Sequence, residues 1–222
     1  MTFTILVRDS HGSFGAAIAS SSPAVAARCL TLRDGVGAVS SQNITDPRLG
    51  PKIMDLMASG LSAEAAINQI VSADPTADYR QILAVDERGE TGVHSGRHSL
   101  GSYGSARAPS IVTAGNLLAS DGVPQAMVDT FIHSTGELEE RLLAALRGAL
   151  VAGGEEGPIR SASLSVVTDI GWRVTDLRVD WDDEPIERLA TLVGVWLPQR
   201  DNYVTRGIAP ETAPAYGVPG DE

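Results

Sequence analysis

The order of the expected elements predicts an α+β protein in which two stacked, mostly antiparallel sheets lie between layers of helices. Strands and helices do not alternate one for one along the 222 residues, because helices come in pairs between groups of strands. That order argues against a doubly wound parallel sheet, in which each strand is followed by a helix. Small residues on both faces of the stretch FGAAIAS (14–20) indicate a strand that is covered on both sides.

The first forty residues show strand patterns and no helix signal. Apolar side chains alternate along residues 2–9, and glycine-containing turns at residues 9–12 and 33–35 separate the segments that follow. The expected strands are Thr2–Asp9, Phe14–Ser20, Ala27–Leu32 and Val36–Gln42.

Two helices follow these strands. Pro51 can open the first at its N1 position, and Gly60 closes it. Ser62 caps the second, which ends at Asp74 because Pro75 disfavours a helical residue before it. The remaining expected elements are the strands Arg80–Asp86, Thr91–Ser95 and Ser110–Ala114, the helices Pro124–Ile132 and Glu137–Val151, the hairpin Ser161–Thr168 with Arg173–Asp180, and a last helix Pro185–Trp196.

The chain is expected to hold one domain, residues 1–198, with no linker and no internal repeat. Within it, Ser134 and Glu137 have the spacing of a capping box at the start of a helix. Residues 199–222 are rich in Pro and Gly and end in acidic residues, so we expect a loosely structured or surface-draped tail.

Composition and charge narrow the class of protein. The net charge of −11 argues against a nucleic-acid partner and against binding to anionic membrane surfaces. The single cysteine, Cys29, excludes a disulfide within the chain, and we interpret it as a buried thiol in a reducing compartment. With no signal peptide and no apolar run that would span a membrane, the expected location is the cytoplasm.

Motifs for other enzyme classes are missing from the sequence. No nucleophile elbow, dinucleotide-binding glycine pattern or P-loop occurs. His94 and His98 have helical i, i+4 spacing, but their segment has the pattern of a strand and a turn, and no acidic ligand lies between them. We therefore expect neither a metal site nor a cofactor.

Thr2 is the candidate nucleophile. It follows Met1 directly and begins the first expected strand. A small second residue permits removal of Met1, which would place a hydroxyl and a free α-amine on one residue. The amine can take the hydroxyl proton and so activate a weak oxygen nucleophile. Since an α-amine titrates near pH ~8, part of it can act as a base at neutral pH.

This arrangement resembles the N-terminal-nucleophile (Ntn) hydrolases, and within them a bacterial group described as a domain of unknown function. The resemblance covers residues 1 to about 197 and is carried by the blocks MTFTI (1–5), GAAIAS (15–20), GVGAVSSQN (35–43), DPRLGP (46–51), ASGLS (58–62), YRQ (79–81) and AGNLL (114–118). It implies a four-layer αββα sandwich with the site at the free end of the first strand, and it implies no substrate. Asp9 matches an acidic position of related enzymes loosely.

Other candidate site residues lie at or near expected strand ends, except Arg48, which lies in a loop flanked by prolines. Gln42, Asn43 and Asn116 could hold an oxyanion with amide donors, although Asn43 could equally begin a turn. Gly115 permits a close backbone approach. We expect Ser20, Ser21, Arg48 and Ser161 to contact the substrate. Ser20 and Ser21 could instead form a hydroxyl-rich turn, and Arg48 could instead form a structural ion pair.

The sequence thus predicts an Ntn-type amidohydrolase that cleaves a small linear amide through an acyl-Thr2 intermediate. One alternative is a non-catalytic binding module that keeps the fold. Another is a threonine peptidase, which the stretch SSSP (20–23) makes less attractive because many Ntn peptidases place a lysine there. We expect a homodimer or higher homo-oligomer, because the tail with its aromatic residues would gain by lying on a neighbour.

Overall fold

The computed structural model describes residues 2–218 and contains two antiparallel sheets. The larger sheet has the strand order β10-β9-β2-β1-β8-β7, and the smaller has the order β3-β4-β5-β6. The strands are β1 (Thr2–Arg8), β2 (Phe14–Ser20), β3 (Leu30–Arg33), β4 (Gly37–Asn43), β5 (Arg80–Asp86), β6 (Thr91–Ser95), β7 (Gly104–Ala108), β8 (Ile111–Asn116), β9 (Ser161–Val167) and β10 (Arg173–Val179).

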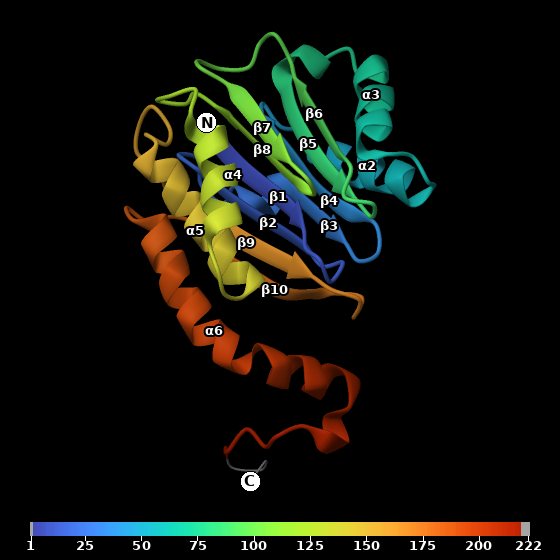
Figure 1. Cartoon of the computed structure of the whole chain (residues 1–222), viewed down its shortest axis with the longest axis vertical. Helices are drawn as coiled ribbons and strands as arrows, with labels where there is room; N and C mark the ends of the chain where they lie inside the picture. The colour runs from blue at the N-terminus through green and yellow to red at the C-terminus, as the bar shows by residue number, and fades with distance from the viewer. Residues whose placement is uncertain (1, 219–222) are drawn as a thin grey trace.

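The helices α2 to α6 form the two outer layers (Figure 1), whereas the short α1 contributes Ala26 and Cys29 to the apolar cluster between the sheets. They are α1 (Ala26–Cys29), α2 (Leu49–Ala58), α3 (Ala63–Ala73), α4 (Val123–His133), α5 (Leu138–Val151) and α6 (Pro185–Ile208). The helices α4, α5 and α6 contact the larger sheet, while α2 and α3 contact the smaller one. The expected four-layer αββα sandwich is therefore confirmed.

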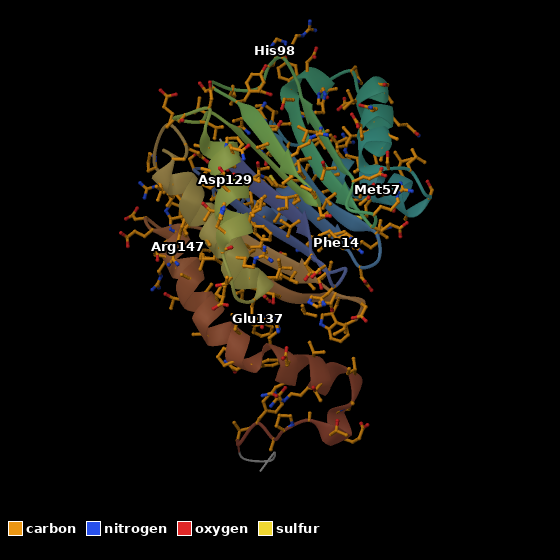
Figure 2. The ribbon with its side chains drawn as sticks, viewed as in Figure 1. Phe14, Met57, His98, Asp129, Glu137 and Arg147 are labelled. Atoms are coloured by element: carbon orange, nitrogen blue, oxygen red, sulfur yellow. The ribbon has the colours of Figure 1, made fainter. Side chains whose placement is uncertain are left out.

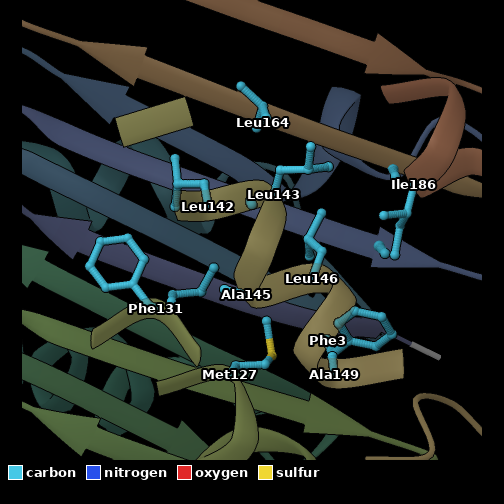
Figure 3. Close-up of a cluster of buried hydrophobic side chains, with 14 of the residues drawn as sticks. Phe3, Met127, Phe131, Leu142, Leu143, Ala145, Leu146, Ala149, Leu164 and Ile186 are labelled. Atoms are coloured by element: carbon cyan, nitrogen blue, oxygen red, sulfur yellow. The ribbon is translucent and has the colours of Figure 1, made fainter. Parts of the chain in front are cut away.

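Three apolar clusters lie between successive layers. One joins the larger sheet to α4, α5 and α6 and includes Phe3, Met127 and Leu146, which lie together in Figure 3. A second lies between the two sheets and includes Leu6 and Phe14, and a third lies beneath α2 and α3. Because Phe3 and Leu6 belong to different clusters, β1 buries both of its faces.

Two short elements differ from the sequence expectation. Residues 26–29 form α1, and only Leu30–Arg33 is a strand, because the alanines Ala26 and Ala27 favour a helical turn. The strand Gly104–Ala108 was not expected, since its Gly, Ser, Ala and Arg residues have low strand propensity. Its pairing with β8 at the edge of the sheet makes it a strand.

The start of α5 is capped differently from the expected pairing of Ser134 with Glu137. Glu137 is itself the N-cap residue, and its backbone N–H donates to the Glu140 carboxylate at 2.9 Å. Ser134 instead ends α4, where its hydroxyl donates to the carbonyl of Phe131. Gly136, with a φ of +104°, makes the turn that moves the cap along the chain.

The last helix is longer than expected, because α6 continues through Pro198 to Ile208 instead of ending at Trp196. The segment that we expected to be irregular from residue 199 is thus helical for its first ten residues. Side-chain contacts on both sides of Pro198 offset the cost of a proline inside a helix. Trp196 Nε1 donates to Thr175 Oγ1 at 2.9 Å, and Arg200 Nη1 donates to the Glu139 carboxylate at 3.2 Å.

The second half of α6 and the residues after it form an arm, residues 199–218, that leads away from the sheets (Figure 1). The described end of the tail lies on α6 of the same chain, where Tyr216 packs 6.3 Å from Tyr203 and Arg206 lies over the Tyr216 ring at 3.8 Å. None of the helices within residues 2–218 is long and apolar enough to cross a bilayer.

Candidate active site

Four polar residues form a row across one end of the larger sheet. Thr2 begins β1 and is paired directly with Asn116 at the end of β8. On the other side of β1 the row continues with Ser20 at the end of β2, and Ser20 is paired with Ser161 at the start of β9. All four residues are buried, and Thr2 is 4% exposed. The strand register therefore brings together residues that lie up to 159 positions apart in the sequence.

The row faces the interior between the two sheets. Along β1, Thr2 and Thr4 lie on the same side as Leu6, which belongs to the cluster between the sheets. Thr4 confirms this direction because its hydroxyl donates to Gln42 Oε1 of the opposite sheet at 2.5 Å. The space between the sheets is thus apolar around Leu6 and polar at the end where β1 begins.

A chain of hydroxyl groups leads away from Thr2. Thr2 Oγ1 donates to Ser20 Oγ at 3.3 Å, and Ser20 Oγ lies 2.8 Å from Ser22 Oγ. Arg28 Nη2 donates to Ser22 Oγ at 2.7 Å. Ser161 supports the same turn, because its hydroxyl donates to the carbonyl of Ser22 at 2.7 Å. The expected hydroxyl-rich turn and a continuous link to Thr2 therefore both occur.

A network of side-chain amides holds the other side of the row. Gln42 Nε2 donates to Gln81 Oε1 at 2.8 Å, and Asn116 Nδ2 donates to the same oxygen at 3.0 Å. Gln81 Nε2 donates in turn to the carbonyl of Gly115 at 3.0 Å and to Ser95 Oγ at 3.1 Å. The bonds of Gln81 to Asn116 and Gly115 cross between the sheets, while its bonds to Gln42 and Ser95 lie within the smaller sheet. Together they determine the orientation of all three amides.

The amide of Asn116 is left with one unsatisfied atom. Its nitrogen donates to Gln81 Oε1, whereas its Oδ1 is buried and has no hydrogen-bond partner among the described residues. An unpaired buried acceptor of this kind costs about 1–3 kcal/mol. Because Asn116 lies opposite Thr2, this acceptor belongs to the surroundings of the candidate nucleophile.

Glu155 is a buried carboxyl group near the row that the sequence analysis did not select. Both of its carboxylate oxygens accept from the backbone N–H of Ser21 at 3.2 Å, next to Ser20. The loop that carries Glu155 is held against the end of β8, where Glu155 bridges to Leu118. Burial away from water raises the pKa of Glu155 to about 7. The group therefore titrates near neutral pH.

Two of the predicted site residues, Asn43 and Arg48, do not belong to the row and make structural contacts instead. The side chain of Asn43, which has a φ of +70°, donates to the carbonyls of Tyr79 and His98 and accepts from the N–H of Leu100, so all its polar atoms serve loop structure. Arg48 is largely exposed and forms an ion pair with Asp46 at 2.6 Å. The turn alternative for Asn43 and the ion-pair alternative for Arg48 both describe what the structure contains.

Asp9 lies at the opposite end of β1, about 23 Å along the strand from Thr2. Its carboxylate accepts from the backbone N–H groups of His11 and Ser13 and so closes the turn between β1 and β2. A cavity of about 560 Å³ lies at that end as well, lined by this turn, the start of α5 and the arm. The row at Thr2 and this cavity are therefore separate places on the molecule.

Gly115 and Cys29 have structural surroundings. A Cβ atom at Gly115 would lie 2.6 Å from the side chain of Leu118, so glycine allows the chain to turn back after β8. Cys29 is buried between the sheets, and burial raises the pKa of its thiol to about 11. The expected buried thiol is thus confirmed. Within residues 2–218, no three His, Cys, Asp or Glu side chains cluster in a way that could hold a metal ion.

The chain is similar over most of its length to one protein family and to a solved structure of that family. The model of a family described as "Family of unknown function (DUF1028)" matches residues 2–189. The crystal structure of protein SPO2555 from Silicibacter pomeroyi, also described under DUF1028, is 30% identical in sequence. It superposes with a TM-score of 0.83 and covers 88% of each chain. No curated protein matches the chain.

Two Anbu structures are more distant. Anbu (ancestral beta-subunit) from Yersinia bercovieri is 10% identical with a TM-score of 0.44, covering 89% of this chain and 95% of its own. An Anbu (Gly-1) mutant from Hyphomicrobium sp. strain MC1 is 12% identical with a TM-score of 0.38, covering 90% and 96%. Similarity at this level supports no conclusion about function.

Proposed function

The chain belongs to the family of unknown function DUF1028, and on that premise we propose that it is an Ntn-type amidohydrolase with Thr2 as its nucleophile. The observation that carries the proposal is the position of Thr2. It begins a strand in the interior of the larger sheet, with its side chain in a buried row of hydroxyl and amide groups. The proposal requires that whatever precedes Thr2 be removed. Met1 lies outside the described residues.

The proposed reaction has two steps. Thr2 Oγ attacks the amide carbonyl while its proton passes to the α-amine of the same residue, and the carbonyl electron pair becomes an oxyanion. The C–N bond then breaks, the leaving amine takes the proton from the α-ammonium, and an acyl ester remains on Thr2. Water releases the acid from this ester and restores the hydroxyl.

The uncharged side chains in the row with Thr2 support an amide substrate. Ser20, Ser161 and Asn116 carry hydroxyl and amide groups and no formal charge. The side-chain nitrogens of Gln42 and Asn43 each donate to two protein acceptors. Asn116 Nδ2 also carries two N–H groups, and one of them donates to Gln81 Oε1. The other N–H of Asn116 is the proposed oxyanion donor. We keep Asn116 as the proposed donor because it alone of the three lies opposite Thr2.

The proposal also extends to cellular context and assembly. We propose a cytoplasmic homodimer that acts on a small-molecule amide without a cofactor, with residues 1–198 as the catalytic domain. A binding module with the same fold and a threonine peptidase remain the two competing functions. A binding module would form no acyl-enzyme, and a threonine peptidase would cleave peptides in preference to small amides.

Four altered forms of the protein test the mechanism, because activity should need both a hydroxyl and a free α-amine on residue 2. Thr2→Ala should abolish hydrolysis of a panel of small linear amides, and Thr2→Ser should retain part of it. An N-terminal tag that is never removed should be as damaging as Thr2→Ala, although the hydroxyl is still present. A C-terminal tag should have no effect.

Intact-mass measurement must accompany the kinetics to establish that the α-amine of Thr2 is free. An acyl adduct on Thr2, trapped by acid quenching during turnover, would support the amidohydrolase over the binding module. Full activity in the permanently N-tagged protein would refute the proposed mechanism.

A further inference from the structure

We propose that Arg28 is a positioning residue for Thr2, acting through the hydroxyl groups of Ser22 and Ser20. This inference rests on the proposed function, because it concerns how the Thr2 hydroxyl becomes a nucleophile. The sequence analysis did not select Arg28, which lies on the short helix α1.

The first observation is an unbroken series of hydrogen bonds from the guanidinium to the nucleophile. Arg28 Nη2 donates to Ser22 Oγ at 2.7 Å, Ser22 Oγ lies 2.8 Å from Ser20 Oγ, and Thr2 Oγ1 lies 3.3 Å from Ser20 Oγ. Because Ser22 accepts from Arg28, its own hydroxyl proton is available to Ser20. Hydrogen bonds arranged in such a chain polarise one another.

The second observation is that the guanidinium is fixed in place and is not neutralised by a neighbour. Its Nη1 also donates to the carbonyls of Pro23 at 2.6 Å and Ala24 at 3.1 Å. No ion pair joins Arg28 to an acidic side chain within residues 2–218, whereas Arg33, Arg48 and Arg80 all have acidic partners. The positive charge of Arg28 therefore acts on neutral hydroxyl and carbonyl groups.

The direction of the effect follows from the chemistry of the attack. As the Thr2 hydroxyl gives its proton to the α-amine, Thr2 Oγ gains negative charge and becomes an acceptor. Ser20 can then turn its hydroxyl toward Thr2 while it accepts from Ser22, so that each donor in the series points from the cation to the developing charge. A charge-assisted series of this kind stabilises the attacking oxygen more than the resting hydroxyl.

Acylation of Thr2 by a monocyclic β-lactone tests this inference without a known substrate. Thr2 Oγ attacks the lactone carbonyl, the ring C–O bond breaks, and the ring oxygen takes the proton as an alcohol, so the chain gains the mass of the lactone. The rate is measured by intact mass on chains whose free Thr2 has been verified. The site of modification is established by peptide mapping.

Ser22→Ala should slow acylation about tenfold, since it cuts the series but leaves the bonds of Arg28 to Pro23 and Ala24 in place. Arg28→Met should slow it by a similar factor, and Arg28→Lys should recover part of the rate. The double variant should be no slower than Ser22→Ala, because both changes remove the same connection. Arg188→Met, which removes an equal charge at an exposed site on α6, should acylate at the wild-type rate.

Circular dichroism and thermal melts should show that each variant is folded. Additive effects in the double variant, or wild-type rates in both Arg28→Met and Ser22→Ala, would overturn the role of Arg28 and leave Thr2 as the nucleophile. A wild-type chain with a free Thr2 that the lactone does not acylate, or equal acylation of Thr2→Ala, would instead contradict the proposed function itself.

Discussion

Asn116 differs from Gln81, its neighbour in the amide network, in how many of its polar atoms are hydrogen-bonded. Gln81 accepts two hydrogen bonds and donates two, so every polar atom of its amide is satisfied. Asn116 donates one bond and keeps a buried acceptor with no partner among the described residues. Because this buried group costs stability and lies beside the proposed nucleophile, we expect it to have a functional role.

Asn116→Ala should therefore lower amide hydrolysis by about a hundredfold or more and leave the free energy of unfolding nearly unchanged. The variant loses one hydrogen bond, but it also removes the unpaired oxygen, and Gln81 Oε1 still accepts from Gln42. Turnover and urea unfolding measure the two effects on the same sample.

Gln81→Met is the matched control because it has a similar volume and removes four hydrogen bonds from the same network. It should destabilise the fold by about 2–3 kcal/mol. If Asn116→Ala destabilises as much as Gln81→Met while turnover stays normal, Asn116 is structural and does not belong to the site.

Glu155 should make stability depend on pH in a definite direction. Its pKa is about 7 in the fold, above the ordinary value of 4.5, so the folded chain holds a proton that the unfolded chain has released. The contribution of Glu155 to the free energy of unfolding should therefore be greatest below about pH 4.5. It should fall as the pH rises to about 7 and then become constant. The difference between the two pKa values corresponds to about 3 kcal/mol.

Glu155→Gln removes this carboxyl and keeps its size. Urea unfolding of both chains between pH 4.5 and pH 8 should give a difference in stability that grows with pH in favour of the variant. A difference that is constant across this range would show that Glu155 does not titrate as expected.

At the scale of elements, the residue pattern within each segment predicted most of the strands. The strand that was not predicted depends on pairing with residues that lie outside its own segment. The bounds of Phe14–Ser20, Arg80–Asp86 and Thr91–Ser95 agree with the expectation because their composition and flanking turns act locally. The strand Gly104–Ala108 forms through its partner β8 and carries no local signal of its own.

Some residues of the candidate site could likewise be predicted from the sequence, and others could not. Thr2 was predicted from its place directly after Met1, and Ser20, Ser161 and Asn116 were predicted as polar residues at or just after the ends of expected strands. Antiparallel pairing places such strand ends together in the structure. Gln81, Arg28 and Glu155 were missed. Gln81 lies within a strand, Arg28 lies on a helix that the sequence did not predict, and Glu155 comes from a loop 134 residues away from its partner Ser21.

The extension of α6 beyond Pro198 serves the stability of the domain. Arg200 contacts the carboxylate of Glu139, which is buried with a side-chain exposure of 1%, and it also contacts Glu137 at the start of α5 (labelled in Figure 2). Arg200→Met should destabilise the fold by about 3 kcal/mol, because it leaves the buried Glu139 without its cation.

Adding Glu139→Gln to Arg200→Met should restore part of this loss, since no buried charge then remains. Arg147→Met is the comparison, because Arg147 pairs with Glu187 between the same two helices but at an exposed position, and we expect a loss of about 1 kcal/mol or less. Equal losses in Arg147→Met and Arg200→Met would contradict a structural role for the arm.

At the scale of the whole molecule, α6 presents apolar side chains that the described part of the chain leaves exposed. Val195 is 59% exposed and Ile208 is 62% exposed, on a helix that leads away from the sheets. We expect these residues to lie in a dimer interface, because a second copy would remove them from water.

Light scattering at micromolar concentration should give twice the 23.2 kDa mass of one chain. Val195→Glu with Ile208→Glu should reduce the mass to that of a monomer. Ile44→Glu, at an exposed apolar residue before α2, should leave it unchanged. A wild-type monomer would count against this expectation.

The position of Thr2 also bears on how the site fluctuates. Its strand β1 is hydrogen-bonded on both sides, to β2 and to β8, and is buried on both faces. Backbone amides in such a strand exchange with solvent deuterium when large parts of a protein open together, not through fraying at an edge. The amides of β1 are therefore expected among the slowest to exchange. Geometry at Thr2 would then persist until the sheet itself opens, unlike that of a site carried on a mobile loop.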